Sequence, residues 1–536
     1  MRPSLSPTLR GGHSGVLWRT WRDLLGDRRV KVANPVRSAS VQWIALRAVK
    51  DLPPRSANRR TKIVATLGPA SSSPEVVDNM LDAGMDVTRF NLAHGNAETH
   101  VRRIAEVRAR AARRGRAVGI LCDLPGPKVR TGEFPDGGLF LAEGDRFRLC
   151  TGDGPSSATE ITVDESMLTQ VVAVGDTIVL GDGTVTLQAV EVGDTCVTAE
   201  VRSGGRLMGR PGCHLPSDRW QPPVPTDEDL DLIHTVAHHA DWVAVSFVRR
   251  ADELVKVREA LGDGGPRLIS KIETRAAVDH LDELLAVSDG VMVARGDLGI
   301  DCPIEDVPYL QKRIIGACVD RGIPVITATQ MLESMITAPT PTRAEASDVA
   351  NAVYDGTDAV MLSAETAIGH DPVLAVATMA RIAERAERAG DFNDRAVPLS
   401  RVRRSPQPAP ARSTAAAVTV AMTRAAGQAA SELDLDAIVC CTRSGRTVRA
   451  MAGLRPRCPL IGASPSATTT KQLALSWGVE PLVVGEYRTT DEMVWCVVEA
   501  SVEQGLIRHG STVAVLAGAP DSPTNATDVL RIVTVR

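Results

Sequence analysis

Eight short apolar runs alternate with charge-rich helical stretches between residues 61 and 390, and this alternation restricts the fold more than any other feature. Each run is rich in β-branched residues, and most are followed by a helical pattern, as is typical of parallel strands joined by helices. Eight such units favour a closed (β/α)8 TIM barrel over an open sheet. The runs are Ile63 to Thr66, Val87 to Phe90, Gly119 to Asp123, Trp242 to Phe247, Arg267 to Glu273, Gly290 to Arg295, Pro324 to Thr329 and Ala359 to Glu365.

The interval between the third and fourth runs has a different pattern. Leu139 to Leu149 and Asp176 to Val190 carry β-forming residues around Gly-Asp turns. This predicts an inserted small β-barrel lid domain over residues 126–216, with the barrel domain at 58–125 and 217–390. The lid would cap the barrel mouth, because the loops that follow barrel strands open on the catalytic face.

The C-terminal part is predicted to be an α/β domain at residues 391–536. A Pro-rich stretch without periodicity at 403–412 indicates a linker or an exposed loop near its start. No internal repeat is evident in the chain. The predicted strands of this domain are Ala437 to Cys440, Leu460 to Ala463, Pro481 to Val484, Thr512 to Leu516 and Val529 to Val533.

The composition excludes several classes of protein. With 43% apolar and 24% charged residues, the chain is neither disordered nor fibrous. No apolar run approaches the roughly 18 residues of a membrane helix, and a net charge of −4 argues against nucleic acid as a partner. The ten Cys stand at irregular positions without a CxxC pair, which predicts reduced thiols and a cytoplasmic location.

The first 57 residues differ from the rest in charge. They hold nine Arg and two Lys against three Asp. Such a segment is typical of an organelle transit peptide, but a poorly ordered extension or a start codon assigned too far upstream would look the same. These three interpretations remain open.

Polar residues stand at the ends of the eight runs, where a barrel places its active site. Arg, Lys and carboxylates at one mouth suit an anionic substrate held through a divalent metal, with Glu273 and Asp297 as the metal ligands. Lys271 lies two residues before Glu273 on the same face of a strand, which favours stabilising a transferring phosphoryl group or an enolate. For any single residue an ordinary barrel salt bridge is the alternative. The residues are Arg89, Asn91, Asp123, Ser246, Lys271, Glu273, Arg295, Asp297, Thr329, Gln330, Ser363 and Glu365.

Seven blocks of the sequence form a specific set: Arg59 to Ser73, Gly84 to Gly95, Ser270 to Thr274, Val291 to Ile300, Ala328 to Met335, Pro341 to Thr366 and Thr442 to Thr447. Together these blocks resemble the pyruvate kinase family, and the resemblance extends from about residue 58 to the end of the chain. It implies the same three domains and a glycolytic enzyme that transfers the phosphoryl group of phosphoenolpyruvate to ADP, giving pyruvate and ATP.

The resemblance also implies a role for each matching residue. Lys271 would stabilise the phosphoryl group in flight and the enolate, Thr329 would belong to the proton relay, and Arg89 would contact the phosphate. Glu273 and Asp297 would hold Mg²⁺ or Mn²⁺. The turn at Ala294, Arg295, Gly296 and Asp297 would receive the substrate; Asn91, His94, Arg130 and the lid residue Asp182 would lie on the nucleotide side; and Ser246, Phe247, Ser363 and Glu365 would support the site from behind.

The sequence departs from the family pattern at the monovalent-cation pocket. That pocket falls on Asn91, Ala93, Asp123 and Leu124, so a Ser hydroxyl is missing. Lys128 stands where potassium-requiring members carry Glu, and a fixed ammonium there would replace the charge of a bound potassium ion. We therefore expect activity without potassium.

A second departure lies in the lid, where Pro211 occupies the position of a Lys that reaches the nucleotide phosphates. Arg210 is the residue that would compensate for this loss. Family likeness also implies a homotetramer and an allosteric phosphate-effector site at Thr442, Arg443, Ser444, Gly445, Arg446 and Thr447, whose alternative is a plain strand-to-helix turn.

Two rival functions remain open at this point. One is a non-catalytic paralogue that senses effectors, and the other is a metal-dependent lyase or aldolase acting on pyruvate. ATP formation that requires both ADP and phosphoenolpyruvate separates the three, because a sensor makes no ATP and a lyase needs no nucleotide.

Overall fold

The computed structural model describes residues 59–181, 183–216, 219–389, 414–518 and 526–536, all within one compact unit. The basic segment at 1–57, the predicted linker at 403–412 and Asp182 therefore lie outside the described residues. No helix in these ranges is long and apolar enough to cross a membrane.

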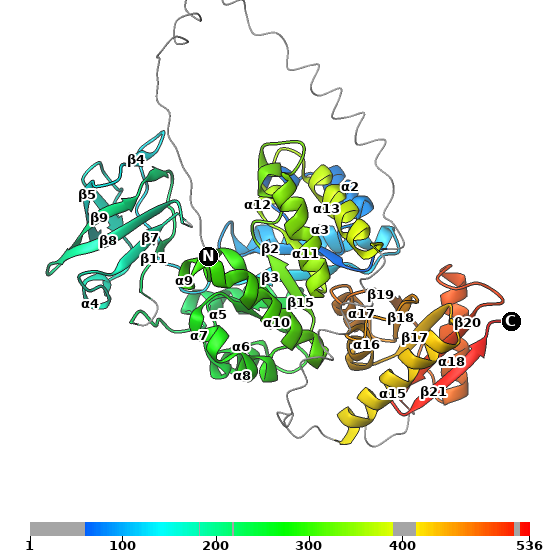
Figure 1. Ribbon diagram of the computed structural model, residues 1–536. Coiled ribbons are helices and arrows are strands. Elements are labelled where there is room, and N and C mark those ends of the chain that lie inside the picture. Colours follow the sequence, from blue (N-terminus) through cyan, green and yellow to red (C-terminus); the bar gives the residue numbers. More distant parts are fainter. Residues whose placement is uncertain (1–58, 182, 217–218, 390–413, 519–525) are drawn as a thin grey trace, which may run out of the picture. The chain divides into compact units, whose positions relative to one another are not determined.

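Eight parallel strands close into a barrel, which confirms the predicted fold (Figure 1). The register of β1 on β16 closes the ring, with Lys62 opposite Ala359. Side chains of Val64, Leu121, Ile269, Met292 and Ile326 fill the interior. The strands are β1 (Lys62–Thr66), β2 (Val87–Asn91), β3 (Gly119–Asp123), β12 (Trp242–Val245), β13 (Arg267–Ile272), β14 (Gly290–Ala294), β15 (Val325–Ala328) and β16 (Ala359–Leu362).

Helices surround the barrel and bury their apolar faces against the outer side of the strands. Their ends carry the expected signals: Ser73 caps α2 through the amide of Val76, and Gly84 ends that helix in the left-handed conformation. The helices are α2 (Pro74–Ala83), α3 (Ala97–Arg113), α5 (Asp227–Thr235), α6 (Ala251–Leu261), α7 (Arg275–Asp279), α8 (Leu281–Val287), α9 (Arg295–Asp301), α10 (Val307–Arg321), α11 (Arg343–Asp355), α12 (Ala364–Ala367) and α13 (Pro372–Glu387).

The inserted region forms a separate β domain with its own apolar core. Its main sheet has the order β11-β7-β8-β9-β5-β6, and β10 pairs with β4 beside it. We call residues 126–216 the lid domain. Its elements are β4 (Leu139–Leu141), β5 (Arg146–Thr151), β6 (Glu160–Val163), α4 (Leu168–Val171), β7 (Thr177–Leu180), β8 (Val185–Val192), β9 (Cys196–Ser203), β10 (Gly205–Leu207) and β11 (Cys213–His214).

One expectation about the lid is wrong. Cys150 and Cys196 form a disulfide, whereas the sequence predicted reduced thiols throughout. The two residues stand directly opposite each other on β5 and β9, and this register brings together positions 46 residues apart in the chain. Spacing along the sequence does not reveal such a pair. The other eight cysteines are free.

The C-terminal domain is a five-stranded sheet with the order β19-β18-β17-β20-β21, which confirms the predicted α/β class. Only the edge strand β21 runs antiparallel to its neighbour. The strands are β17 (Ala437–Cys441), β18 (Leu460–Ser464), β19 (Val479–Val483), β20 (Thr512–Ala517) and β21 (Val529–Thr534), and the helices are α15 (Thr414–Glu432), α16 (Arg446–Ala452), α17 (Ala467–Leu473) and α18 (Thr490–Glu503).

A repeated contact organises the base of the barrel, where the strands begin. An aspartate precedes each of β2, β12, β14 and β16, and its carboxylate accepts the amide of a residue in the preceding barrel strand. Each of these carboxylates also pairs with an arginine. The Asp–amide pairs are Asp86–Ile63, Asp241–Ile120, Asp289–Leu268 and Asp358–Val325. The sequence analysis missed this repeat, because little more than the Asp itself recurs.

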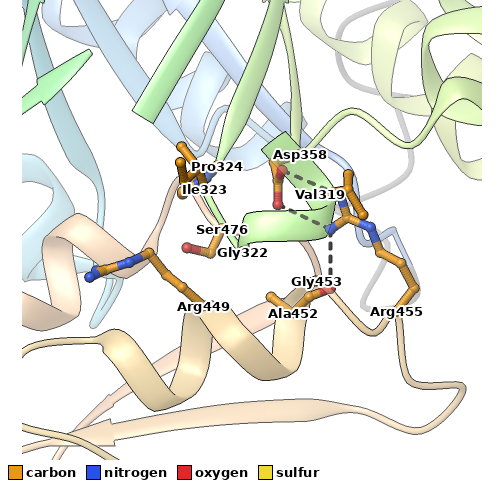
Figure 2. A pocket seen from close by; sticks show the side chains of 10 residues that line it. All are labelled: Val319, Gly322, Ile323, Pro324, Asp358, Arg449, Ala452, Gly453, Arg455 and Ser476. Atoms are coloured by element: carbon orange, nitrogen blue, oxygen red, sulfur yellow. Dashed lines mark hydrogen bonds and ion pairs between the residues drawn. The ribbon is translucent and has the colours of Figure 1, made fainter. Parts of the chain in front are cut away.

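At Asp358 this contact also joins the barrel to the C-terminal domain. Arg455 Nη1 donates to Asp358 Oδ1 over 3.0 Å, and the Trp477 amide donates to the same oxygen. Figure 2 shows Asp358 and Arg455 side by side, with Arg449 and Ser476 lining the same small pocket. Arg455 and Asp358 are both almost fully buried.

Candidate active site

Lys271 lies at the centre of the barrel mouth. It is the fifth residue of β13, and its Nζ lies 2.8 Å from Glu273 Oε1 and 3.2 Å from Asp123 Oδ1. Ser246 Oγ accepts a hydrogen bond from Nζ at 2.7 Å and donates to the carbonyl of Leu124. Burial alone would lower the pKa of Lys271, but Asp123 and Glu273 raise it above its usual value. The group therefore stays a positively charged ammonium.

Glu273 and Asp297 are the two carboxylates predicted to bind metal, and both line one cavity of about 60 Å³. Glu273 is 1% exposed, and its Oε1 receives no hydrogen bond in the described part of the chain. Burial raises its pKa and outweighs the charge of Lys271. Burial also acts on Asp297, but contacts with His214 and Lys128 hold its pKa well below the usual range. The charged neighbour of Glu273 Oε1 is the Lys271 ammonium at 2.8 Å, whereas the contacts of Asp297 Oδ1 with His214 and Lys128 are longer, at 3.4 and 3.7 Å.

No group of three or more His, Cys, Asp or Glu side chains suited to a metal occurs among the described residues. Two carboxylates agree with a hard divalent cation that takes its remaining ligands from water and substrate. The donor set, two carboxylates on the wall of one cavity, therefore fits such an ion.

Thr329 lies across the mouth in a strained backbone conformation. Its φ is 64°, and those of Gln330 and Phe247 are 55° and 56°. Such values are costly for residues other than glycine and occur mainly at functional sites. Thr329 Oγ1 accepts the amide of Gly296 at 2.8 Å, and this contact fixes the hydroxyl beside the turn after β14. The Phe247 amide donates to Glu273 Oε2, so the strain holds that carboxylate in place.

The pocket predicted for a monovalent cation is occupied by contacts within the chain. Arg89 and Lys271 both pair with Asp123. Burial raises the pKa of Asp123, but these two cations outweigh burial, and the net pKa lies below its usual value. The Leu124 carbonyl accepts the hydroxyl of Ser246. Asn91 Oδ1 accepts the amide of Ala93 at 3.3 Å. Lys128 Nζ lies 3.7 Å from Asp297 Oδ1, which places its ammonium beside the predicted metal ligand.

Basic groups gather on the side predicted to bind nucleotide. Burial lowers the pKa of His94, and the charges of Arg130, Arg89 and Lys128 lower it further, so all three cations lie near this ring. Arg130 also donates to the carbonyl of Arg210. Arg210 is half exposed and pairs with Asp164 at 3.6 Å.

The side chain of Arg295, in the turn predicted to receive the substrate, is held by contacts within the barrel. Its guanidinium pairs with Asp348 at 2.7 Å and donates to the carbonyls of Ala328 and Thr329. The side chain thus braces the end of β15, which leaves the backbone of the Ala294–Gly296 turn as the part able to meet a substrate.

Glu365 and Ser363 follow β16, and Glu365 acts as a staple between two loops. Its carboxylate accepts the amides of Leu332 and Ser363 at 3.0 and 2.7 Å, and burial raises its pKa. The Ser363 hydroxyl is buried and has no hydrogen-bond partner within the described residues.

The predicted effector loop lies in the C-terminal domain and runs from the end of β17 into the first turn of α16, which begins at Arg446. Thr442 Oγ1 accepts the amide of Gly445, and Thr447 bonds Thr527. The Ser444 carbonyl accepts Arg267 Nη2 at 2.8 Å. Arg267 begins β13, the strand that carries Lys271. Arg443 and Arg446 are exposed.

The sequence analysis missed His214 of the lid as a site residue. Its Nε2 lies 3.4 Å from Asp297 Oδ1. No motif points to this contact, because β11 contains only two residues and Asp297 lies far away in the chain. Pairing of β11 with β7 is what fixes the ring in place.

Comparisons with known proteins agree with this arrangement. The family model described as "Pyruvate kinase, barrel domain" matches residues 58–376, and "Pyruvate kinase, alpha/beta domain" matches residues 420–533. Pyruvate kinase of Geobacillus stearothermophilus is 41% identical over 480 residues, which cover 88% of this chain and 80% of that relative. The corresponding enzyme of Clostridium acetobutylicum is 37% identical over 88% of this chain and 99% of its own length.

A third relative is the pyruvate kinase of Methylorubrum extorquens, 40% identical over 89% of this chain and 97% of its own length. Members of the family are phosphotransferases that use phosphoenolpyruvate and ADP and depend on a divalent metal. Matches of this extent span the barrel and the C-terminal domain alike. The chain is therefore a phosphotransferase that belongs to the pyruvate kinase family.

Proposed function

We propose that Lys271 is the catalytic centre of this chain's transfer of a phosphoryl group from phosphoenolpyruvate to ADP. The observation that carries the proposal is a buried ammonium between Asp123, Glu273 and Ser246 at the end of β13. A fixed positive charge in a water-poor site stabilises the charge that develops on the phosphoryl oxygens and on the enolate. A metal-dependent lyase acting on pyruvate would also form an enolate but needs no nucleotide, so ATP formation from ADP separates the two.

Arg89 and Thr329 complete the substrate side of the proposal. Arg89 is anchored to Asp123 at 2.7 Å, so its guanidinium is oriented before a phosphate arrives. Thr329 Oγ1 is held by the Gly296 amide, and we assign it to the proton relay that converts the enolate to pyruvate. The backbone of Ala294, Arg295 and Gly296 would receive the carboxylate of the substrate.

Glu273 and Asp297 are the proposed ligands of the divalent cation, with Mg²⁺ or Mn²⁺ as the ion. When bound, the cation offsets the negative charge of the substrate. The chain's own contribution is to hold both carboxylates. The Phe247 amide fixes Glu273, and Lys128 lies on one oxygen of Asp297.

The nucleotide would lie near Asn91, His94 and Arg130. Arg210 is the candidate replacement for the lysine that Pro211 displaces. It is half exposed and its ion pair with Asp164 is long, so it is available to a phosphate.

Independence from potassium is the finer part of the proposal. The oxygens that would bind potassium already have partners within the chain: Arg89 and Lys271 on Asp123, and Ser246 on the Leu124 carbonyl. Lys128 adds a positive charge to the same mouth. We therefore expect a bound monovalent cation to be dispensable.

Three further properties are proposed from family likeness. They are a homotetramer, a cytoplasmic location and a phosphorylated effector at the loop 442–447. The hydrogen bond from Arg267 to the Ser444 carbonyl supports a link from that loop to β13.

The test is pyruvate formation from phosphoenolpyruvate and ADP, in potassium or tetramethylammonium salts at equal ionic strength. We expect similar kcat in both salts, and a loss of more than about 100-fold in Lys271→Met. Lys256→Met, at an exposed lysine on α6, is the matched control and should keep full activity. A strong loss of rate in tetramethylammonium would contradict potassium independence, and an active Lys271→Met would contradict the catalytic role.

A further inference from the structure

The cavity at the barrel mouth has walls from two domains. Lys128 and His214 come from the lid domain, whereas Phe247, Glu273 and Asp297 come from the barrel; Trp220 lies on the segment that returns the chain to the barrel. The cavity measures about 60 Å³ and contains both carboxylates of the proposed cation site. A group of the lid therefore lies within reach of the cation.

The lid sheet dictates where His214 lies. In β11, Cys213 is opposite Leu180 and His214 is opposite Val179. Cys213 is 4% exposed and belongs to the lid core, so strand alternation turns His214 to the other face. The amide of Cys213 also donates to the carbonyl of Val129 at 2.9 Å. The backbone that carries the imidazole can move relative to Asp297 only together with the lid sheet.

The contact falls on one oxygen of Asp297. His214 Nε2 lies 3.4 Å from Oδ1, and Lys128 Nζ lies 3.7 Å from the same atom. His214 Nε2 is itself buried and makes no hydrogen bond of good geometry within the described ranges. Burying a polar atom without a hydrogen bond is costly, so such atoms commonly have a functional role. Here the atom faces Asp297, whose surroundings would change when a cation binds.

We propose that His214 is a positioning residue for the divalent-cation site, which makes cation affinity depend on the lid lying against the barrel. The inference rests on the proposed role of Asp297 as a cation ligand. Groups that hold a ligating carboxylate from behind orient it and raise its affinity for the metal. Because binding linkage is reciprocal, the cation must also favour the docked lid.

Two other roles of His214 make different predictions. A ring that only fills space would leave cation affinity unchanged when it is shortened. A ring that competes with the cation for Asp297 would weaken binding, so that its removal would tighten it. Only a positioning role predicts weaker binding after removal and recovery with another polar side chain of similar reach.

The first experiment measures Mn²⁺ binding to the full chain by electron paramagnetic resonance, without substrates. We expect His214→Ala to weaken binding by about 10- to 100-fold, and His214→Gln to recover most of it. His238→Ala is the matched control, because that ring is exposed and contacts only the His234 carbonyl and the His239 ring among the contacts found in the described residues; the variant should bind Mn²⁺ as the wild type does. Unchanged or tighter binding in His214→Ala would overturn the proposal.

The second experiment follows the lid by amide hydrogen exchange of the β11 segment with and without Mn²⁺. The wild type should gain protection there on adding Mn²⁺, and His214→Ala should gain none. Asp297→Asn separates the two hypotheses. If Asp297→Asn binds Mn²⁺ normally, Asp297 is not a ligand of the cation. If Asp297→Asn loses binding while His214→Ala keeps it, the cation site stands and only the positioning role of His214 is rejected.

Discussion

Buried carboxylates at the two ends of the barrel differ in how closely they are paired. At the base, Asp289 and Asp358 have both oxygens taken by arginine and backbone amides. At the mouth, the ion-pair contacts of Asp297 are longer, 3.4 Å to His214 and 3.7 Å to Lys128. The pocket beside Asp358 measures about 10 Å³, against about 60 Å³ at the mouth. Closely paired carboxylates therefore hold the barrel together, and the loosely paired Asp297 is kept for a ligand.

The partner cations differ in the same sense. Arginine dominates the base, where its planar fork fixes several acceptors at once. Lys271 and Lys128 lie at the mouth. An ammonium is a compact charge with three donors, so it can bind an arriving substrate while it keeps contact with a carboxylate. The base is thus built to be rigid without a ligand, whereas the mouth is completed by one.

The largest expected effect is at the mouth. Glu273→Gln should lower kcat by more than about 100-fold, because it removes one of the proposed cation ligands and a partner of Lys271. The unfolding temperature should stay close to that of the wild type or rise, since functional sites are commonly not optimised for stability. Steady-state kinetics and thermal unfolding of the same preparation test this. Retained activity, or loss of activity only together with unfolding, would remove the distinction between the two ends.

The second effect is at the base, where we expect a loss of stability without a loss of activity. Asp358→Asn leaves Arg455, which is 3% exposed, without its charged partner. Breaking such a buried pair costs about 3–5 kcal/mol of unfolding free energy. Urea unfolding should show this loss, while kcat below the unfolding transition stays close to that of the wild type.

The exposed pair Arg531–Asp491 supplies the control for that experiment. Asp491→Asn removes an ion pair at the surface of the C-terminal domain, where both side chains are largely exposed. Its cost should lie between about 0 and 1 kcal/mol. Equal losses in Asp358→Asn and Asp491→Asn would show that burial at the base has no special role.

Much of this architecture could be predicted from the sequence, because period and composition carry it. Gly119 to Asp123 forms β3 as expected. The run Trp242 to Phe247 stops short, at Val245, since Phe247 leaves the extended conformation with a φ of 56°. The apolar pattern marks the strand, and the backbone change comes from the site, where the Phe247 amide holds Glu273.

What could not be predicted depends on contacts between distant segments. The Cys150–Cys196 disulfide follows from the register of two lid strands, and the contact of His214 with Asp297 follows from how the lid meets the barrel. Arg295 stands at the end of a barrel strand, as expected, but Asp348 of α11 holds its guanidinium. Residue type and spacing contain none of this information.

The smallest expected effect concerns acid stability and separates two aspartates within the base. Burial raises the pKa of Asp289, but Arg267, the Leu268 amide and Arg258 outweigh it and the net pKa is lowered. At Asp241 burial prevails over Arg108, and the pKa is raised. Asp289 therefore contributes stability that is present above its unfolded pKa of about 3.9 and is lost as the pH falls through the lower folded value, by at most about 1.4 kcal/mol per pH unit.

Urea unfolding between pH 5 and pH 3 tests this difference. The unfolding free energy of Asp289→Asn should fall less steeply with decreasing pH than that of the wild type, because one carboxylate that favours the folded state when ionised is gone. The unfolding free energy of Asp241→Asn should fall more steeply with decreasing pH than that of the wild type. The pKa of Asp241 is raised in the folded state, so this acid takes up its proton at a higher pH when folded, and the protonation opposes acid unfolding. Identical slopes in both variants would mean that Asp241 and Asp289 are electrostatically equivalent, and that these two share geometry alone.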